Sequence, residues 1–218
     1  MGSRLVYGNG VGRMWVSDEP VANPFDYWWF VNHEGSIPSY RGVVFDAPHQ
    51  IEWWRSFLRA RPPEELAECD PLALLRAAGY GLDRLASPAP ANGTSYGDDH
   101  GASAAGWLAL LAVGSLADVP FHLGLDDLYF GVPEFRSCVL RSWHERYGAL
   151  LFRCSGSTMS LVVSHPPTSV ETARLLAQEH LAFSPETYTW AEGRSEDQFI
   201  EAIAERLLLL GRWDFWWD

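Results

Sequence analysis

The stretch PEFRSCVLRSWHERYGALLFRCSGSTMSLVV, at residues 133–163, decides the fold. Its first half carries a large apolar or aromatic side chain at every fourth position: Phe135, Val139, Trp143 and Tyr147. This spacing places all of them on one face of a helix, and Gly148 is a suitable helix end. Two apolar runs then flank a Ser-Gly-Ser turn, which is typical of a β-hairpin. The stretch therefore predicts a helix followed by an antiparallel pair of strands.

The rest of the C-terminal half extends this pattern. An apolar run at 107–113 predicts a buried strand, and a short helix is expected around 115–122. A Thr-x-x-Glu spacing at 168–171 and a Ser-x-x-Gln spacing at 195–198 are capping boxes, and each predicts the start of a helix. The order of elements predicts an α+β fold, a two-layer sandwich of a mostly antiparallel sheet with helices on one face.

Composition divides the chain into three parts. Residues 86–106 are dominated by Pro, Gly, Ser and Ala and show no apolar periodicity, which is typical of a linker or a mobile loop. Residues 107–218 form the C-terminal α+β domain. Residues 1–85 are expected to form a smaller, tryptophan-rich α/β region that precedes it.

Charge and composition exclude several classes of function. The 218 residues include 28 acidic and 16 basic side chains, a net charge of −12, and every basic residue is Arg. An acidic protein is a poor match for nucleic acid, because binding there depends on neutralising phosphates. Without lysine the chain cannot form a Schiff base or a Walker-type phosphate site. An excess of acid does suit a basic protein partner.

Three cysteines, Cys69, Cys138 and Cys154, are too few and too dispersed to predict a disulfide framework. Their odd number favours reduced thiols in a cytosol. The N-terminus lacks the apolar segment of a signal peptide, and no apolar run approaches the roughly 20 residues of a membrane span. We therefore expect a cytoplasmic protein with no membrane partner.

Candidate catalytic residues are few. Asp18 and Glu19 follow a predicted strand beside a proline turn, a position where functional carboxylates collect, although capping of the turn by Asp18 is an alternative. His33 and the terminal Asp218 complete the set. No His or Cys spacing matches a zinc motif and no cofactor fingerprint is present, so neither a metal nor a cofactor is expected.

The aromatic residues are the strongest signal in the composition, with 11 Trp in the chain. Adjacent side chains in a helix or strand cannot both face one core, so one member of each Trp-Trp pair is expected at an edge, a cleft or a partner surface. Indoles beside carboxylates suit an apolar or cationic small molecule, or an Arg- or Lys-rich peptide. Filling of the core is the alternative. The candidate binding residues are Trp15, Trp28, Trp29, Trp53, Trp54, Trp216 and Trp217.

Four segments resemble, in order and spacing, the bacterial domain of unknown function 4253 family: VLRSWHERYG at 139–148, PPT at 166–168, EHLAF at 179–183 and WDFWWD at 213–218. The resemblance is clear over residues 107–218 and weaker at the N-terminal strand and turn, 14–21. Family members often carry Cys-Pro-Asp where this chain has Ser184-Pro185-Glu186, so no thiol or metal role carries over there. The resemblance implies a fold and its boundaries, and no reaction.

Together these features predict a binding protein, whose acidic, aromatic surface recognises a protein or peptide partner. Analogy with acidic bacterial proteins that act as immunity-like partners of toxins gives a sharper form, with a basic toxin as the partner. The alternative is an enzyme that acts on a small molecule or peptide in a Trp-lined pocket containing carboxylates. A structural subunit of a larger assembly is a third hypothesis.

Overall fold

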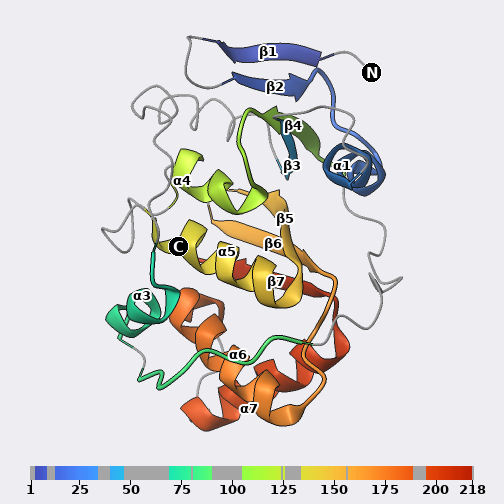
Figure 1. Ribbon diagram of the computed structural model, residues 1–218. Helices are drawn as coiled ribbons and strands as arrows, with labels where there is room; N and C mark the ends of the chain where they lie inside the picture. The colour runs from blue at the N-terminus through green and yellow to red at the C-terminus, as the bar shows by residue number, and fades with distance from the viewer. Residues whose placement is uncertain are drawn as a thin grey trace.

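The fold is α+β, with helices packed around one central sheet (Figure 1). The computed structural model describes residues 3–8, 13–33, 40–46, 69–79, 81–89, 105–123, 125, 134–155, 157–188 and 195–217. The strands are β1 (Ser3–Gly8), β2 (Arg13–Ser17), β3 (Arg41–Phe45), β4 (Trp107–Leu111), β5 (Ala149–Cys154), β6 (Thr158–Val163) and β7 (Arg212–Trp216). The helices are α1 (Pro24–His33), α3 (Pro71–Ala77), η1 (Leu116–Asp118), α4 (Val119–Leu123), α5 (Phe135–Tyr147), α6 (Val170–Phe183), η2 (Pro185–Tyr188) and α7 (Glu196–Leu209).

A single seven-stranded sheet has the strand order β1-β2-β4-β3-β5-β6-β7. Neighbouring strands are antiparallel except β3 and β5, which run parallel and pair at Val44 and Arg153. Strands β1–β3 precede the segment 86–106 and β4–β7 follow it, yet β4 lies between β2 and β3. The three parts that composition distinguishes therefore do not correspond to separate sheets, since residues 1–85 contribute strands to the sheet of the C-terminal part.

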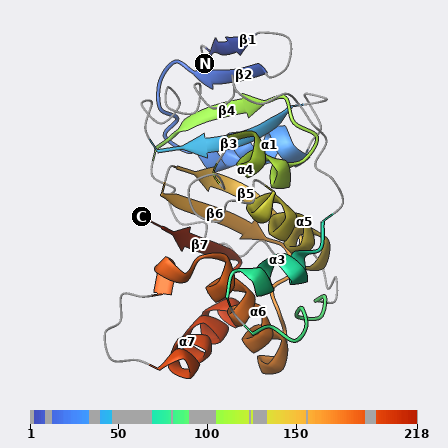
Figure 2. The ribbon, with the colours of Figure 1, turned by 90° about the vertical axis from the view of Figure 1, so that its left-hand side faces the viewer.

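Helices lie on both faces of this sheet. In Figure 2, α4 and α5 lie in front of the strands, α6 and α7 lie beside β7, and α1 lies behind β3. The helices after residue 107 thus gather on the expected side, whereas α1 covers the opposite face. The indole N–H of Trp28 in α1 donates to the carbonyl oxygen of Leu151 in β5 at 2.9 Å, and the Trp28 ring packs edge-on against Phe152. These contacts hold α1 against the middle of the sheet.

The helix predicted at 133–148 is α5, and its four regularly spaced apolar side chains are all buried. Gly148 ends it in the left-handed region, with φ of 61°, as expected for a residue without a Cβ atom. The predicted capping box at 195–198 forms at the start of α7. The one predicted at 168–171 is wrong by one residue, because Ser169 caps α6 and accepts a hydrogen bond from the Thr172 N–H.

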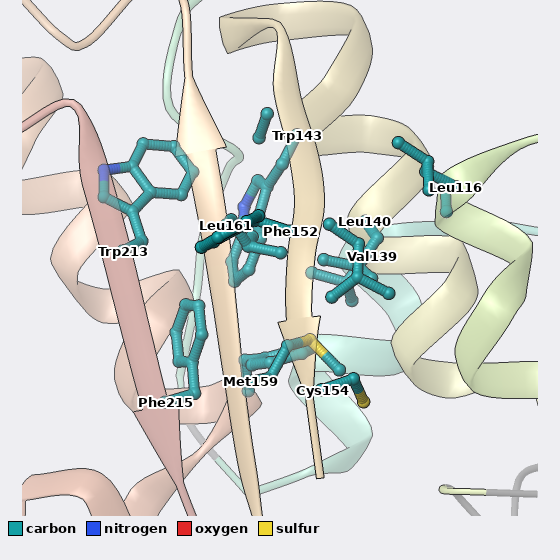
Figure 3. Packing of buried hydrophobic residues seen from close by; sticks show 14 of the residues in the cluster. Leu116, Val139, Leu140, Trp143, Phe152, Cys154, Met159, Leu161, Trp213 and Phe215 are labelled. Atoms are coloured by element: carbon teal, nitrogen blue, oxygen red, sulfur yellow. The ribbon is translucent and has the colours of Figure 1, made fainter. Parts of the chain in front are cut away.

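Aromatic side chains fill the core between α5, α6 and the β6–β7 edge. The Trp143 ring of α5 stacks on Phe215 of β7, with centroids 5.5 Å apart, and meets Trp213 edge-on at 5.6 Å. Figure 3 shows Trp213 and Phe215 side by side along β7, facing Leu161 and Met159 of the neighbouring strand. The predicted end motif is therefore an edge strand that closes the core.

The cysteines differ from the sequence expectation of reduced thiols. Cys69 and Cys138 form a disulfide that joins the start of α3 to the middle of α5, so this expectation is wrong for two of the three. Their positions, 69 residues apart in the chain, come together only because α3 packs across α5. Cys154 is free and buried, and burial raises the pKa of its thiol.

Among the helices that the structure describes, α6 and α7 are the longest, with 14 residues each, whereas a membrane span needs about 20 apolar residues. Across the ranges that the structure describes, no helix has both the length and the hydropathy to cross a bilayer.

Candidate functional site

A cleft of about 460 Å³ opens at one end of the sheet. Its lining includes Asn32, His33, Arg41, Gly114, Ser115, Leu116, His144, Gly148, Leu150, Ser164 and His165. We call it the histidine cleft. Two other cavities measure about 20 and 40 Å³, which is room for one or two waters. The histidine cleft alone of these three falls in the size range of small-molecule sites, roughly 300–1,000 Å³.

Strand direction explains why polar residues from distant segments meet at this cleft. The parallel strands β3 and β5 both begin at this end of the sheet, and their antiparallel partners β4 and β6 both end there. The helices that precede β3 and β5, α1 and α5, also end there, on opposite faces of the sheet. A crevice between the ends of the two helices follows from this topology, as at the switch points of open sheets.

The α1 side of the cleft is fixed by Asn32. Its amide N–H donates to the carbonyl oxygens of Trp28 and Gly42, and its amide oxygen accepts from the Gly42 N–H, at 2.9–3.0 Å. These bonds join the last turn of α1 to the start of β3. They place His33, one residue later, beside Arg41, one residue before Gly42.

His33 rests against the helix that carries it. Its ring stacks on Trp29 with centroids 3.5 Å apart, and Nδ1 lies 3.2 Å from the Trp29 carbonyl oxygen. A carbonyl can only accept, so the proton of the neutral ring sits on Nδ1. Burial lowers the pKa of His33, and the hydrogen bond to Trp29 opposes this effect. His33 is therefore a mostly uncharged member of the cleft at neutral pH.

The opposite wall is the end of α5 and the end of β6. A Cβ atom on Gly148 would lie 2.5 Å from Ser164 Oγ and 3.0 Å from His165 Nδ1, so these two side chains lie directly over the glycine. The Ser164 hydroxyl donates to the Gly148 carbonyl oxygen at 3.1 Å, and the His165 N–H donates to the Tyr147 carbonyl oxygen at 2.9 Å. Gly148 thus lets β6 approach the end of α5 and brings His165 to the cleft.

Arg41 is the main fixed charge in the lining. It is half-buried, and its Nη1 donates to the Tyr40 carbonyl oxygen at 2.9 Å. Six other arginines pair with carboxylates: Arg84, Arg141, Arg146, Arg153, Arg174 and Arg212. In the part of the chain that the structure describes, Arg41 has no carboxylate partner. A half-buried guanidinium without a counter-ion stands out in a protein of charge −12.

Helix dipoles explain part of this arrangement. His33 and His144 lie in the last turns of α1 and α5, where cationic side chains gain about 0.3–1 kcal/mol each from the helix dipole. The dipole does not explain Arg41 or His165, because one begins a strand and the other follows one. The fixed positive charge that Arg41 gives the cleft is therefore not a consequence of helix capping.

The structure separates the predicted catalytic residues. Asp18 and Glu19 are exposed and follow β2 at the end of the sheet where β4 begins, opposite the histidine cleft. His33 lies in the cleft, and Asp218 lies outside the described residues. The structure does not bring His33 together with Asp18 and Glu19, since the length of the sheet lies between them. The hydroxyl of the neighbouring Ser17 has a structural role, because it accepts a hydrogen bond from the Leu108 N–H of β4.

In each of the two tryptophan pairs that the structure describes, one member is buried and the other is half-buried. Trp28 and Trp217 are buried, at 0% and 1% exposure, and present no surface to a partner. Trp29 and Trp216 are half-buried, and Trp15 is 36% exposed on β2. Trp53 and Trp54 lie outside the described residues. Of the candidate binding residues, Trp29 comes nearest to the cleft, through its stack on His33.

Sequence reasoning missed Arg41, His144 and His165. Arg41 lies at the start of a strand and His144 near the end of a helix, and neither is part of a recognisable motif. His165 precedes Pro166-Pro167, which signals only the end of a strand. The position of each residue at a helix end or strand end is a signal that could have identified it as a candidate. Which of these ends meet at one edge of the sheet depends on the strand order, and local sequence does not reveal that order.

The family-like motifs, besides supplying His144 and Gly148 to the cleft, build a buried clamp. The Glu179 carboxylate, fully buried in α6, accepts two hydrogen bonds from Arg146 at 2.6 and 2.9 Å and one from Trp143 Nε1 at 2.8 Å. It also accepts from the Ala86 N–H at 2.7 Å, and Arg146 donates to the Ala86 carbonyl oxygen. We call this group, with Ala86, the Glu179 clamp. It fixes the segment 82–89 across α5 and α6.

The described residues contain no group of three or more His, Cys, Asp or Glu side chains placed to hold a metal ion. The three histidines of the cleft therefore face a common space without forming a coordination site. Their ring nitrogens can donate or accept hydrogen bonds.

Fold and cleft define an α+β protein with a mixed sheet and a cationic cleft between two helix ends. The model of the family described as domain of unknown function (DUF4253) matches residues 108–218, and the chain belongs to this family. No curated protein and no solved structure matches the chain. The matched region supplies His144 and His165 to the cleft, whereas His33 and Arg41 come from the part before it.

Proposed function

We propose that this protein binds a small-molecule ligand in the histidine cleft. The observation that carries the proposal is the convergence of Arg41 and three histidines, from four different elements, on one cavity of about 460 Å³. Leu116 and Leu150 add apolar surface to the same lining. Apolar walls with a few convergent polar groups are the usual composition of a ligand site.

The described lining of the histidine cleft does not favour the enzyme hypothesis. That hypothesis required carboxylates in a Trp-lined pocket, and the described lining of the histidine cleft contains no carboxylate. General acid–base catalysis by histidine alone would still need a partner group within hydrogen-bonding reach of the substrate. We therefore propose binding as the primary function.

Partner recognition remains a second candidate, favoured by exposed aromatic side chains. Tyr27 and Phe30 lie three residues apart on α1 and are 47% and 49% exposed, and aromatic anchors dominate protein interfaces. With a net charge of −12, a basic protein such as a toxin is the proposed partner. Co-purification with the product of an adjacent gene, from wild type and from a Tyr27→Ala/Phe30→Ala variant, tests this candidate. Equal recovery with both proteins would contradict it.

The disulfide bears on the compartment. The sequence favours the cytoplasm, but disulfides persist mainly in oxidising environments, and Cys69–Cys138 is bonded. Alkylation of the protein with a maleimide directly in cell lysate distinguishes the two. We propose a cytoplasmic location if all three thiols react after unfolding, and an oxidising compartment if only Cys154 does.

The cleft proposal is tested by blocking the cavity. Gly114 lines the cleft, and a Cβ atom there would meet no atom within 4 Å, so Gly114→Trp adds an indole without displacing the core. Gly81 is equally open and lies outside this lining, which makes Gly81→Trp a matched control. The probe is 8-anilinonaphthalene-1-sulfonate, an anionic aromatic dye whose fluorescence rises on binding.

We expect saturable dye binding by wild type and by Gly81→Trp, and loss of at least about tenfold in affinity for Gly114→Trp, because the indole occupies the cavity. Circular dichroism and thermal unfolding show whether each variant keeps its fold. Equal dye affinity for the two folded variants would contradict the proposed function.

A further inference from the structure

We infer that the ligand of the histidine cleft carries a phosphate monoester group, an inference that rests on the proposed function. The shared property of the lining is donation: the Arg41 guanidinium, the imidazoles of His144 and His165 and a serine hydroxyl face the same space. The described lining offers no carboxylate to attract a cation or to repel an anion. We therefore expect the ligand to be an anion.

Arg41 supplies the anchor for that anion. A guanidinium has five N–H groups in a planar fork, and Arg41 donates one of them to the Tyr40 carbonyl oxygen. The remaining donors match two oxygens of a carboxylate or a phosphate. Arg41 is held in place because β3 is fixed to α1 through Asn32 and Gly42. The guanidinium is thus both partly desolvated and positioned before a ligand arrives.

The number and directions of the other donors favour phosphate over carboxylate. A carboxylate is planar and is satisfied by a single bidentate arginine. Here His144 ends α5 and His165 follows β6, so imidazole donors reach the cavity from two further segments. His33 is not counted among them, because its ring proton is donated to the Trp29 carbonyl oxygen. A tetrahedral anion presents oxygens in several directions and can use donors on separate walls, in the way that phosphate sites collect charge-assisted hydrogen bonds.

The remaining polar side chains have structural roles or are suited to the rest of the ligand. Asn32 and the Ser164 hydroxyl are used in backbone hydrogen bonds. Ser115 Oγ accepts from the Ala117 N–H, which leaves its hydroxyl proton available to donate. Leu116 and Leu150 supply the apolar contact for the organic part of the ester.

Isothermal titration calorimetry with three probes that share a benzene ring tests the inference: phenyl phosphate, benzoate and phenol. We expect one phenyl phosphate per chain, bound about tenfold more tightly than benzoate, with phenol weaker still, because each added charge-assisted bond strengthens binding. Arg41→Gln and His165→Gln should each weaken phenyl phosphate binding about tenfold. The control Arg84→Gln removes an exposed cation and should change it less than about twofold.

Several outcomes overturn the inference. If benzoate binds as tightly as phenyl phosphate, the cleft does not prefer a tetrahedral dianion. If Arg41→Gln binds phenyl phosphate as tightly as wild type, Arg41 does not anchor the anion. If phenyl phosphate fails to bind while the dye still binds in a manner blocked by Gly114→Trp, the phosphate inference fails and the proposed function stands. If the dye is also insensitive to Gly114→Trp, the proposed function itself fails.

Discussion

Two polar clusters lie at the C-terminal part of α5, and they differ in almost every respect. The Glu179 clamp is buried and fully paired, and its Arg146, Trp143 and Glu179 belong to the segments that resemble the family. The histidine cleft is open, its described lining contains no carboxylate, and three of its eleven described lining residues come from before the matched region. Trp143 faces the clamp, whereas His144, the next residue, faces the cleft. A sequence motif on one helix can therefore report on architecture while the ligand site lies on the neighbouring face.

The largest expected effect is loss of the clamp. Replacing Glu179 with Ala leaves Arg146 and the Trp143 N–H buried without their acceptor, and breaking a buried ion pair by removing one partner costs about 3–5 kcal/mol. Urea unfolding of Glu179→Ala measures the loss. The control Glu171→Ala removes the carboxylate of an exposed pair with Arg84 and should cost less than about 1 kcal/mol. If Glu179→Ala and Glu171→Ala lose the same free energy of unfolding, the clamp stabilises the protein no more than an exposed ion pair does.

Reduction of the disulfide should come next. Cys69 and Cys138 close a long loop, with 69 residues between their positions, and such cross-links stabilise by about 2–4 kcal/mol. We expect a Cys69→Ser/Cys138→Ser variant to unfold at lower urea concentration than wild type, and dithiothreitol to lower the stability of wild type only. Because the cleft lies away from α3, dye binding by the folded variant should not change. If the variant loses dye binding at temperatures where it is folded, the disulfide and the histidine cleft are coupled, contrary to this prediction.

Gly148 lines the cleft and follows Arg146 of the clamp by two residues, so it tests whether the two clusters are independent. Its φ of 61° and the close approach of Ser164 Oγ make Gly148→Ala strained, at a cost of about 2 kcal/mol from the left-handed backbone and the contact. The substitution should also displace His165 and weaken dye binding. A stability loss with unchanged dye affinity would show that β6 shifts without altering the cleft. Thermal unfolding and dye titration of one sample measure both effects.

The smallest effect is a pH dependence of stability. Burial lowers the pKa of His180, aided by Arg146 and Arg206, so the unfolded chain binds a proton more readily than the native protein. Stability contributed by neutral His180 is complete above the unfolded pKa of about 6.5 and falls below it, by up to about 1.4 kcal/mol per pH unit. His33 contributes in the same direction. His180→Phe should flatten the decline in urea midpoint between pH 6.5 and 5, and an unchanged slope would contradict this assignment.

Local pattern was enough to predict the elements but not their arrangement. The four-residue spacing from Phe135 to Tyr147 defined α5, and the capping signal at Ser195 defined the start of α7. The parallel pairing of β3 with β5 could not be predicted, because it depends on packing of segments more than a hundred residues apart. The same applies to the disulfide and to the cleft. Each of these features joins residues whose neighbours in sequence carry no sign of the contact.

Histidine ring signals give the most direct test that the cleft, and not the family-like core, is the ligand site. Long-range ¹H–¹⁵N spectra of ¹⁵N-labelled protein, assigned with single His→Gln variants, would be recorded while phenyl phosphate is added. We expect the ring nitrogens of His33, His144 and His165 to shift together with one saturation curve, while buried His180, behind the Glu179 clamp, stays constant. Saturable binding that leaves His144 and His165 unshifted, or that moves His180 instead, would contradict the assignment of the cleft.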